Sequence, residues 1–289
     1  MRFAVTLPHF GPYADARLLS EMALEAEQAG WDGFFIWDHI SWGMSGTPMV
    51  DPWVALTAVA MTTSRVRFGP MVTPLPRRRP TKVARETVSL DRLSGGRLIQ
   101  GVGIGEGEDE WQNLGDEGDP KVRGAMLDEA LDLLVKLWSG QAVDHEGAFY
   151  TVRHSIYLPT PVQQPRIPIW VAGKWPNKRP FLRAARWDGV VPLKQGGTMG
   201  EVMTPGDLRE VRDYVLEHRS VEAPFDVVVG GHTSGKDRAD DAGIVAPYIE
   251  VGATWWVEDI SPWTSAGWSW GAPWPLDAMR ERIRSGPPV

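Results

Sequence analysis

Short runs rich in β-branched and aromatic residues alternate with longer amphipathic stretches along the whole chain, and this alternation restricts the fold more than any other feature. Strands that alternate with helices form a parallel sheet in which the helices are the crossover connections. The predicted strands are 2–7, 33–37, 66–72, 97–103, 167–172, 189–193, 225–230 and 254–258. The predicted helices, with apolar residues at helical spacing, are 16–29, 52–63, 81–93, 123–138, 177–186, 205–218, 238–251 and 276–284. Eight strands, each followed by a helix, predict an α/β fold of the (β/α)8 TIM-barrel type.

One barrel accounts for all 289 residues, so we expect a single domain over 1–289. A net charge of −7, with acids and bases interleaved, argues against a nucleic-acid or membrane-surface partner and favours a small-molecule substrate. The absence of cysteine excludes disulfides, thiolate nucleophiles and zinc-thiolate sites. No run approaches the roughly 18 apolar residues of a membrane span, and the first residues resemble a strand rather than a signal peptide. We therefore expect a cytoplasmic protein.

Two segments depart from the alternation. Residues 140–165 alternate apolar and polar residues and are punctuated by Gly and Pro, and we interpret them as a short excursion before the fifth strand. Residues 261–275 (SPWTSAGWSWGAPWP) follow the last strand and fit neither helix nor strand. Because the active site of such barrels lies at the carboxyl ends of the strands, these tryptophans either wall an apolar pocket or pack the barrel mouth.

A carboxylate and an imidazole, Asp38 and His39, follow the second predicted strand. Such a pair can move protons near neutral pH, because histidine titrates there and a nearby carboxylate tunes it. The alternative is a histidine that only satisfies neighbouring backbone groups. With His9, which follows the first strand, the pair could also bind a divalent metal ion, although the later strands supply only Glu258 and Asp259 as further acids.

The fourth strand runs into a glycine-rich turn, residues 101–107 (GVGIGEG). Glycine lets the backbone approach a flat ring or a phosphate closely, which makes Gly103, Ile104 and Gly105 candidate cofactor contacts. The motif lacks the further glycine of a dinucleotide fingerprint, and a plain tight turn explains it equally well.

The fifth strand ends at Ala172-Gly173-Lys174, shortly before Asn177, which can cap the next helix. Two basic residues, 178 and 179, stand in the first turn of that helix. A helix amino-terminus with cations beside it suits a phosphate group, and a solvated basic loop is the alternative.

Three separated segments, in order, resemble the luciferase-like monooxygenase family, whose members are barrels that bind flavin mononucleotide (FMN) or the deazaflavin coenzyme F-420. They are AEQAGWDGFFIWDHI at 26–40, the stretch from DPWVALTAVAM to GVGIGEG at 51–107, and PRIPIWVAG with RAARWDGVVP within 165–192. The terminal GATWWVED and RERIRSGPP resemble the close of the shorter actinobacterial members. The likeness covers nearly the whole chain.

This resemblance assigns roles to individual residues. Asp38 and His39 match the Asp-His pair of deazaflavin-dependent members, in which the histidine lies against the isoalloxazine ring, and this favours F-420 over FMN. Glu106 matches a position where some relatives place a carboxylate near the N1 edge of the ring, so it joins His39 as a candidate catalytic residue. The arginines at 77–79 suit the acidic oligoglutamate tail of F-420, although exposed, solvating charge explains them more simply.

The resemblance also implies a cofactor-binding set at the strand ends: Asp38, His39, Met71, Val72, Thr73, Gly103, Ile104, Gly105, Ala172, Gly173, Lys174 and Pro192. Relatives carry a non-prolyl cis peptide under the ring at the position of Met71-Val72, and we expect it here, although a cis Gly69-Pro70 bond could replace it. The residues by which sugar-phosphate dehydrogenases of the family grip their substrate have no match in this chain.

Taken together, the resemblance implies an oxidoreductase that transfers a hydride between coenzyme F-420 and a small organic substrate, with His39 or Glu106 handling the proton. Three alternatives stay open: an FMN-dependent monooxygenase fed by a separate reductase, a non-catalytic flavin-binding barrel, and a metal-dependent hydrolase. A homodimer is also left open.

Overall fold

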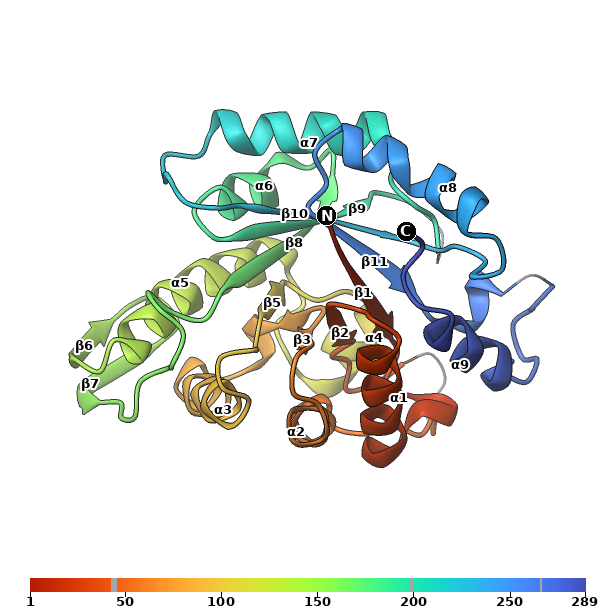
Figure 1. The fold of residues 1–289 in the computed structure, drawn as a ribbon. Helices are drawn as coiled ribbons and strands as arrows, with labels where there is room; N and C mark the ends of the chain where they lie inside the picture. Colours follow the sequence, from red (N-terminus) through yellow and green to blue (C-terminus); the bar gives the residue numbers. More distant parts are fainter. Residues whose placement is uncertain (43–45, 198–199, 266) are drawn as a thin grey trace.

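A parallel β-sheet closes into a barrel in the computed structural model, which describes residues 1–42, 46–197, 200–265 and 267–289 (Figure 1). The barrel strands are β1 (Arg2–Leu7), β2 (Gly33–Ile36), β3 (Arg67–Pro70), β4 (Thr73–Pro74), β5 (Gln100–Gly103), β8 (Ile169–Trp175), β9 (Gly189–Lys194), β10 (Asp226–Gly231) and β11 (Trp255–Asp259). They pair in the order β3-β2-β1-β11-β10-β9-β8-β5-β4. Because β3 and β4 are one passage of chain interrupted only by residues 71 and 72, this order forms a ring. The predicted α/β barrel is confirmed.

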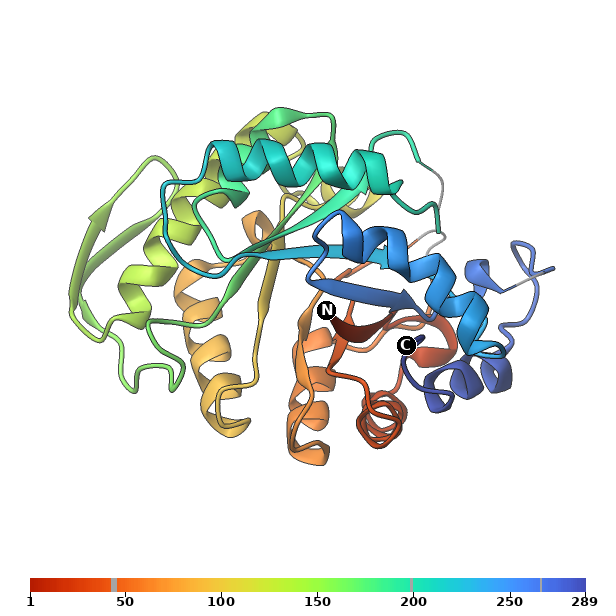
Figure 2. The ribbon, with the colours of Figure 1, turned by 45° about the horizontal axis from the view of Figure 1, so that its top comes forward.

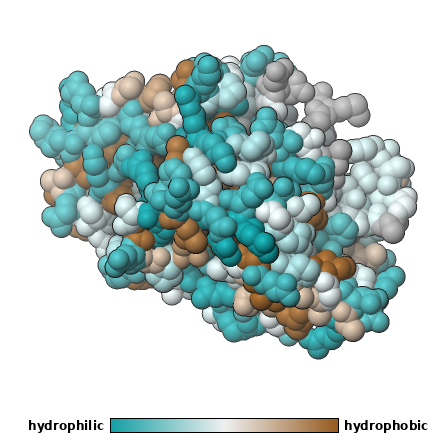
Figure 3. Space-filling view, turned by 90° about the horizontal axis from the view of Figure 1, so that it is seen from above, coloured by the Kyte–Doolittle hydropathy of each residue, from teal (hydrophilic) through white to brown (hydrophobic). Residues whose placement is uncertain are grey.

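Helices follow the strands and cover the outside of the barrel. They are α1 (Ala16–Gln28), α2 (Pro52–Thr62), α3 (Pro80–Leu93), α4 (Glu108–Trp111), α5 (Pro120–Trp138), α6 (Lys178–Ala184), α7 (Pro205–Glu217), α8 (Arg238–Glu250) and α9 (Leu276–Arg284). In Figure 2, α1 to α3 lie along one side of the barrel and α7 and α8 along the other. Seen from above, hydrophilic side chains predominate, as expected for helices that face solvent (Figure 3). Within the described residues, none of the helices has the length and apolar character needed to cross a membrane.

Several helices, among them α1, α2, α5, α6, α7 and α8, begin after a short polar side chain that caps their first turn. Asp51, for example, accepts hydrogen bonds from the backbone N–H groups of the first turn of α2, and Pro52 follows as the first helical residue. Proline suits this position because its missing N–H would have no partner there. Asp119 and Pro120 repeat the arrangement at α5. These signals explain why the predicted helix starts lie close to the observed ones.

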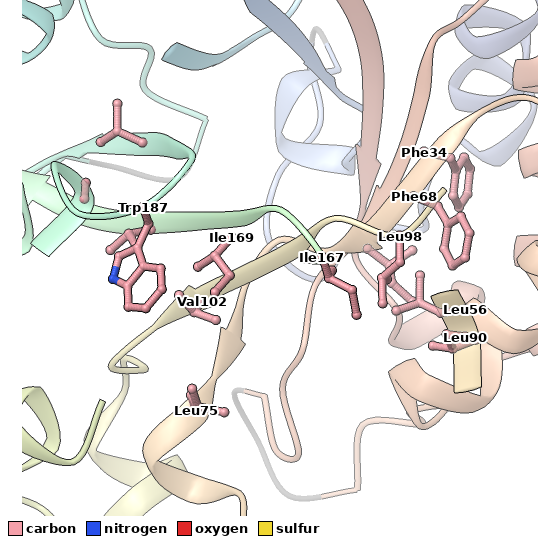
Figure 4. Packing of buried hydrophobic residues seen from close by; sticks show 14 of the residues in the cluster. Phe34, Leu56, Phe68, Leu75, Leu90, Leu98, Val102, Ile167, Ile169 and Trp187 are labelled. Atoms are coloured by element: carbon pink, nitrogen blue, oxygen red, sulfur yellow. The ribbon is translucent and has the colours of Figure 1, made fainter. Parts of the chain in front are cut away.

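Two apolar cores lie on the two faces of the strands. The lumen core contains Ala4, Phe35, Ile99, Trp170, Val191, Val228, Trp255 and Val257. The outer core fills the space between strands and helices, and Figure 4 shows Phe34, Phe68 and Leu98 of the strand layer meeting Leu56 and Leu90 of α2 and α3. Successive side chains of a strand point to opposite faces of the sheet. A strand residue that belongs to the lumen core therefore shows that the residues two positions before and after it also point into the lumen.

The excursion at 140–165 is a β-hairpin of β6 (Ala142–Glu146) and β7 (Thr151–Ile156), which pair in antiparallel fashion. It projects beyond α5, away from the other helices (Figure 1). An excursion before the fifth predicted strand is therefore confirmed, and the alternation of apolar and polar residues in this segment is the ordinary signal for its two half-buried strands.

Candidate active site

The floor of the barrel mouth is apolar. Met71 and Ala172 pack on the lumen core and are only partly buried. The Met71-Val72 peptide bond is cis, which confirms the prediction, whereas Gly69-Pro70 is not among the cis bonds of the described residues. Both partly exposed side chains belong to the predicted cofactor-binding set, and they offer a surface on which a flat ring can lie.

Asp38 is fixed by its neighbours just after the end of β2. Its side chain is fully buried, Oδ2 accepts a hydrogen bond from the Thr73 hydroxyl at 2.8 Å, and Oδ1 accepts one from the Arg78 guanidinium at 2.7 Å. Arg77 donates to the backbone carbonyl of Asp38 at 3.1 Å. Both carboxylate oxygens are therefore engaged in joining the end of β2 to the β4 segment. No cluster of acids and histidines able to hold a metal ion is found in the described part of the chain.

His39 is held by a buried carboxylate that the sequence interpretation did not single out. Its Nδ1 lies 3.0 Å from Oε2 of Glu110 in α4, and the side chain of His39 is 20% exposed while that of Glu110 is 4% exposed. Oε1 of Glu110 accepts from the backbone N–H of Ile40 at 2.6 Å and pairs with the Arg77 guanidinium at 3.0 Å. The indole of Trp42 packs against the imidazole, with ring centroids 4.7 Å apart.

The charge state of Glu110 sets the tautomer of His39. Burial pushes the pKa of Glu110 upward, but the hydrogen bond from His39, the charge of Arg77 and the hydrogen bond from the Ile40 N–H outweigh it, so the pKa is lowered. An ionised carboxylate can only accept, and the proton between the two residues therefore belongs to Nδ1 of His39. Its Nε2 has no hydrogen-bond partner among the described residues and is free to exchange a proton with a ligand.

His9 supports His39 from below. The two imidazoles stack with centroids 6.4 Å apart and planes inclined by 6°. Nε2 of His9 donates to the backbone carbonyl of His39 at 3.0 Å, and its Nδ1 is buried without a partner. Burial lowers the pKa of His9, against the opposing effect of that hydrogen bond. His9 is therefore neutral at pH 7 and leaves one acceptor atom unused.

Two of the three arginines at 77–79 are not the exposed, solvating charges that the sequence suggested as the simpler explanation. The side chains of Arg77 and Arg78 are 5% and 18% exposed and are engaged with Asp38 and Glu110, while Arg79 is exposed at the start of α3. Because two of the three guanidiniums already neutralise buried carboxylates, Arg77 and Arg78 do not have the free charge that an acidic cofactor tail would need.

Glu106 and Lys174, two predicted site residues, form an ion pair at the rim of the mouth. Their side chains are 65% and 41% exposed. Glu110 follows Glu106 by four residues in the same acidic stretch, and it is Glu110 that reaches His39. The signal that could have found it is this spacing after a glycine-rich turn, which puts a second carboxylate one helical turn further on.

The glycines within β5 and directly after it serve contacts within the protein. A Cβ on Gly101 would lie 2.2 Å from the Pro70 carbonyl oxygen, and one on Gly103 would lie 3.0 Å from the Val72 side chain. Gly105 has φ +78°, and a Cβ there would lie 2.1 Å from the Trp111 indole. The turn thus needs glycine to bring β5 against the cis segment and to seat Trp111, and the neighbouring Ile104 stays partly exposed.

At the start of α6, which follows β8, one of the two cations of the predicted phosphate site is engaged with aromatic rings. Asn177 caps α6 as predicted, but Lys178 lies over the rings of Trp175 and Tyr214, 3.5 and 4.3 Å from their centroids. Its charge is therefore directed to aromatic faces.

Two other predicted contacts lie on the outer side of the strands. A Cβ on Gly173 would meet Pro180 of α6 at 2.3 Å. Pro192 pairs with Gly173 in register and is buried, and it stands two residues after Val190, a member of the outer core. Strand alternation therefore places both next to the helices rather than in the lumen.

The tryptophan-rich segment both walls the mouth and packs it. Trp263 lies 5.3 Å from Trp37 in a tilted pair, at the top of the lumen. Trp274 packs edge-on against Phe10 and Tyr13, outside it. Trp270 is 68% exposed. Both interpretations of 261–275 therefore hold, the pocket wall for Trp263 and the packing role for Trp274. Residue 266 of this segment lies outside the described residues.

The chain is similar in sequence and in fold to known proteins. Residues 1–246 match the model of a family described as luciferase-like monooxygenase. The chain belongs to the luciferase-like monooxygenase family. Solved structures support the fold: an F-420-dependent secondary alcohol dehydrogenase with an F-420-acetone adduct has a TM-score of 0.72 at 16% identity over 89% of this chain and 93% of the other. An F-420-dependent tetrahydromethanopterin reductase from Methanopyrus kandleri has a TM-score of 0.71 at 17% identity over 99% and 98%.

Curated relatives of this luciferase-like chain use both types of cofactor. An F-420-dependent glucose-6-phosphate dehydrogenase of Beutenbergia cavernae is 36% identical over 169 residues, which are 57% of this chain and 49% of the relative. The oxygenase component of a flavin-dependent trigonelline monooxygenase of Acinetobacter baylyi is 27% identical over 235 residues, 80% of this chain and 62% of the relative. The chain therefore spans about half to three fifths of the length of these relatives.

Proposed function

We propose that this luciferase-like barrel is an oxidoreductase that transfers a hydride between coenzyme F-420 and a small organic substrate. One observation carries the proposal: at the end of β2, His39 keeps an unpartnered Nε2 beside an apolar floor, and a buried, ionised Glu110 holds its other nitrogen at 3.0 Å. An imidazole that is held in place in one tautomer can act as the acid or base of a proton-transfer reaction. The F-420-dependent relatives support the choice of cofactor.

The mouth fits a flat ring with polar edges. Met71 and Ala172 supply the apolar face, and His39 stands at its side. Nδ1 of His9, which is buried without a partner among the described residues, is the kind of atom that a bound polar ligand satisfies. When bound, the deazaflavin ring supplies two-electron hydride chemistry.

The protein's own residues handle the proton. In the oxidation of an alcohol, Nε2 of His39 takes the hydroxyl proton as the carbon-bound hydrogen leaves with its electron pair, and in the reverse direction Nε2 returns it. Glu110 stabilises the imidazolium formed in between, because its carboxylate already accepts from Nδ1. Arg77 keeps Glu110 ionised and oriented. Asp38 anchors the backbone from which His39 projects.

The cofactor is tested by equilibrium dialysis of the purified protein against F-420 and against FMN, with metal analysis of the same sample. The proposal requires F-420 to bind more tightly. A clear preference for FMN would favour a monooxygenase fed by a separate reductase, the activity type named in the relative that matches 80% of this chain. Binding of neither ring would remove the proposal.

We also propose that two copies of the chain associate through α2. This helix (PWVALTAVAMT) has no charged residue. Val54 and Met61, seven residues apart on its outer face, are 59% and 68% exposed, and Leu93 at the end of α3 is 48% exposed. A helix that is apolar on all sides favours burial on all sides, which a second copy provides.

A further inference from the structure

The last barrel strand ends in a carboxyl group that points into the mouth. Trp255 and Val257 of β11 belong to the lumen core, while Trp256 belongs to the outer core. Alternation then sends the side chain of Glu258 outward and that of Asp259 inward, one layer above Val257. Asp259 is thus placed at the carboxyl end of the barrel, where ligands of this fold bind.

A buried hydroxyl lies beside it. Thr6 of β1 pairs in register with Asp259, and Thr6 points into the lumen because Ala4, two residues earlier, does so. Thr6 is 8% exposed, and its Oγ1 has no hydrogen-bond partner in the part of the chain that the structure describes. Oδ1 of Asp259 is also buried without a partner, while its Oδ2 accepts from the Trp263 indole at 3.3 Å. Two neighbouring polar atoms, Oγ1 of Thr6 and Oδ1 of Asp259, therefore have no hydrogen-bond partner among the described residues and are available to a ligand in the mouth.

These groups share the mouth with His39. The Trp263 ring that donates to Asp259 lies 5.3 Å from the Trp37 ring, and the Trp37 ring lies 5.9 Å from the imidazole of His39. Asp259 is separated from the proton-transfer group by two aromatic rings.

No cation neutralises Asp259. It takes part in none of the ion pairs of the described residues, and the basic side chains around the strand ends are paired with other acids: Arg77 with Asp38 and Glu110, Arg78 with Asp38, Lys174 with Glu106, Lys194 with Glu201, and Arg282 with Glu258. Burial raises the pKa of the Asp259 carboxyl to about 6, against the stabilising effect of Ser261 and Trp263, and Glu258 adds to the rise. A further anion placed here would be repelled.

We infer that Asp259 and Thr6 form the substrate subsite of this barrel, and that the subsite recognises a hydrogen-bond donor, a hydroxyl or an amine, and excludes phosphate and carboxylate groups. The inference rests on the proposed function only for the reaction that follows binding. It separates this chain from relatives named for a phosphorylated sugar, because an anionic group needs a free cation and this mouth presents an unpaired acid.

The test is a binding comparison with four probes that share one ring: cyclohexanol, cyclohexylamine, cyclohexanecarboxylate and cyclohexyl phosphate. Each is titrated by ligand-observed saturation-transfer NMR at pH 7.5, with the protein alone and with F-420 added. Cyclohexanol and cyclohexylamine should bind, and the two anions should bind at least tenfold more weakly. Because the titration without cofactor does not depend on F-420, it stays informative if the proposed function fails.

Three variants assign the binding to the subsite. Asp259→Asn should weaken cyclohexylamine by about ten- to a hundredfold and cyclohexanol by only a few-fold, because the amide keeps an acceptor but loses the charge. Thr6→Val keeps the shape of the side chain and should weaken cyclohexanol about three- to tenfold. Asp277→Asn removes the same charge from the exposed start of α9 and should change nothing.

Circular dichroism melting checks that all three variants are folded. The inference is overturned if an anionic probe binds as tightly as the alcohol or the amine, if no probe binds, or if a folded Asp259→Asn variant keeps the wild-type affinity for the amine.

Discussion

Replacing Glu110 by glutamine should disable His39 without removing it. The glutamine amide can donate a hydrogen bond to Nδ1, which then no longer carries the proton, and the proton moves to Nε2. Nε2 would then be unable to accept a proton from the substrate. Arg77, whose side chain is 5% exposed, loses its carboxylate partner at 3.0 Å in the same step.

The size of both effects follows from the contacts. A hydrogen bond to a charged group is worth about 1.5 to 3 kcal/mol, and breaking a buried ion pair costs about 3 to 5 kcal/mol. In the variant, Arg77 keeps its contacts with Asp38, whose carbonyl lies at 3.1 Å and whose carboxylate lies at 3.6 Å. The range for a hydrogen bond to a charged group therefore applies, and the free energy of unfolding should fall by about 2 to 3 kcal/mol. Loss of a correctly positioned base should slow hydride transfer about 10²- to 10⁴-fold.

The assay combines urea unfolding, cofactor affinity and single-turnover hydride transfer. Glu86→Gln, which removes an acid from the exposed pair with Lys82 on α3, is the matched control and should cost less than about 1 kcal/mol. Since the pKa of Glu110 is lowered in the folded protein, its contribution is present above the ordinary value of 4.5 and is lost as the pH falls through the folded value. A Glu110→Gln variant with the wild-type rate and pH profile would refute the tautomer argument.

Three further predictions follow from the mouth and the surface. His39→Ala and His39→Gln should lose about 10²- to 10⁴-fold in hydride transfer but only about five- to thirtyfold in cofactor affinity; collapse of binding with a preserved rate would make His39 a wall of the pocket. Asp259→Asn should raise the free energy of unfolding at pH 7.5 by at most about 3 kcal/mol, because burial raises the pKa of Asp259 from 3.8 to about 6 and disfavours its ionised form. In wild-type protein this penalty grows as the pH rises through that window and is absent below 3.8, so equal stabilisation at all pH values would contradict it. Met61→Glu should give a monomer in sedimentation where the wild type is a dimer, and an unchanged assembly would exclude the α2 face.

The barrel could be predicted from local signals because each strand and helix carries its own. The apolar pattern along the chain predicted all eight strands, and each predicted start lies within three residues of the observed one. The largest difference is at the fourth strand, which is predicted at 97–103 and observed at Gln100–Gly103. The difference there has a cause: Arg97 turns its guanidinium toward carbonyls at the end of α2, so its segment makes only an isolated bridge, Phe68↔Leu98, before β5 begins. Such a side-chain contact between distant residues leaves no trace in a local pattern.

The sequence predicted those site residues that follow directly after a strand. It did not predict contacts between side chains that are far apart along the chain. His39 could be located because it follows a strand, whereas its partner Glu110 lies 71 residues away. Arg77 and Arg78 looked like surface charge because a sequence does not show that two buried acids face them. The glycines of 101–107 fit a cofactor loop and a tight turn equally well, and only the distances to Pro70 and Trp111 show which internal contacts need them.

Hydride transfer with and without oxygen tests the central claim most directly. Protein loaded with oxidised F-420 is mixed with a panel of neutral alcohols in a stopped-flow instrument, and the loss of the oxidised ring's absorbance is followed in air and in anaerobic buffer while dissolved oxygen is monitored. The account predicts that at least one alcohol reduces the ring at the same rate under both conditions, that no oxygen is consumed, and that His39→Gln slows the step about 10²- to 10⁴-fold. Turnover that requires FMN and consumes oxygen would contradict it.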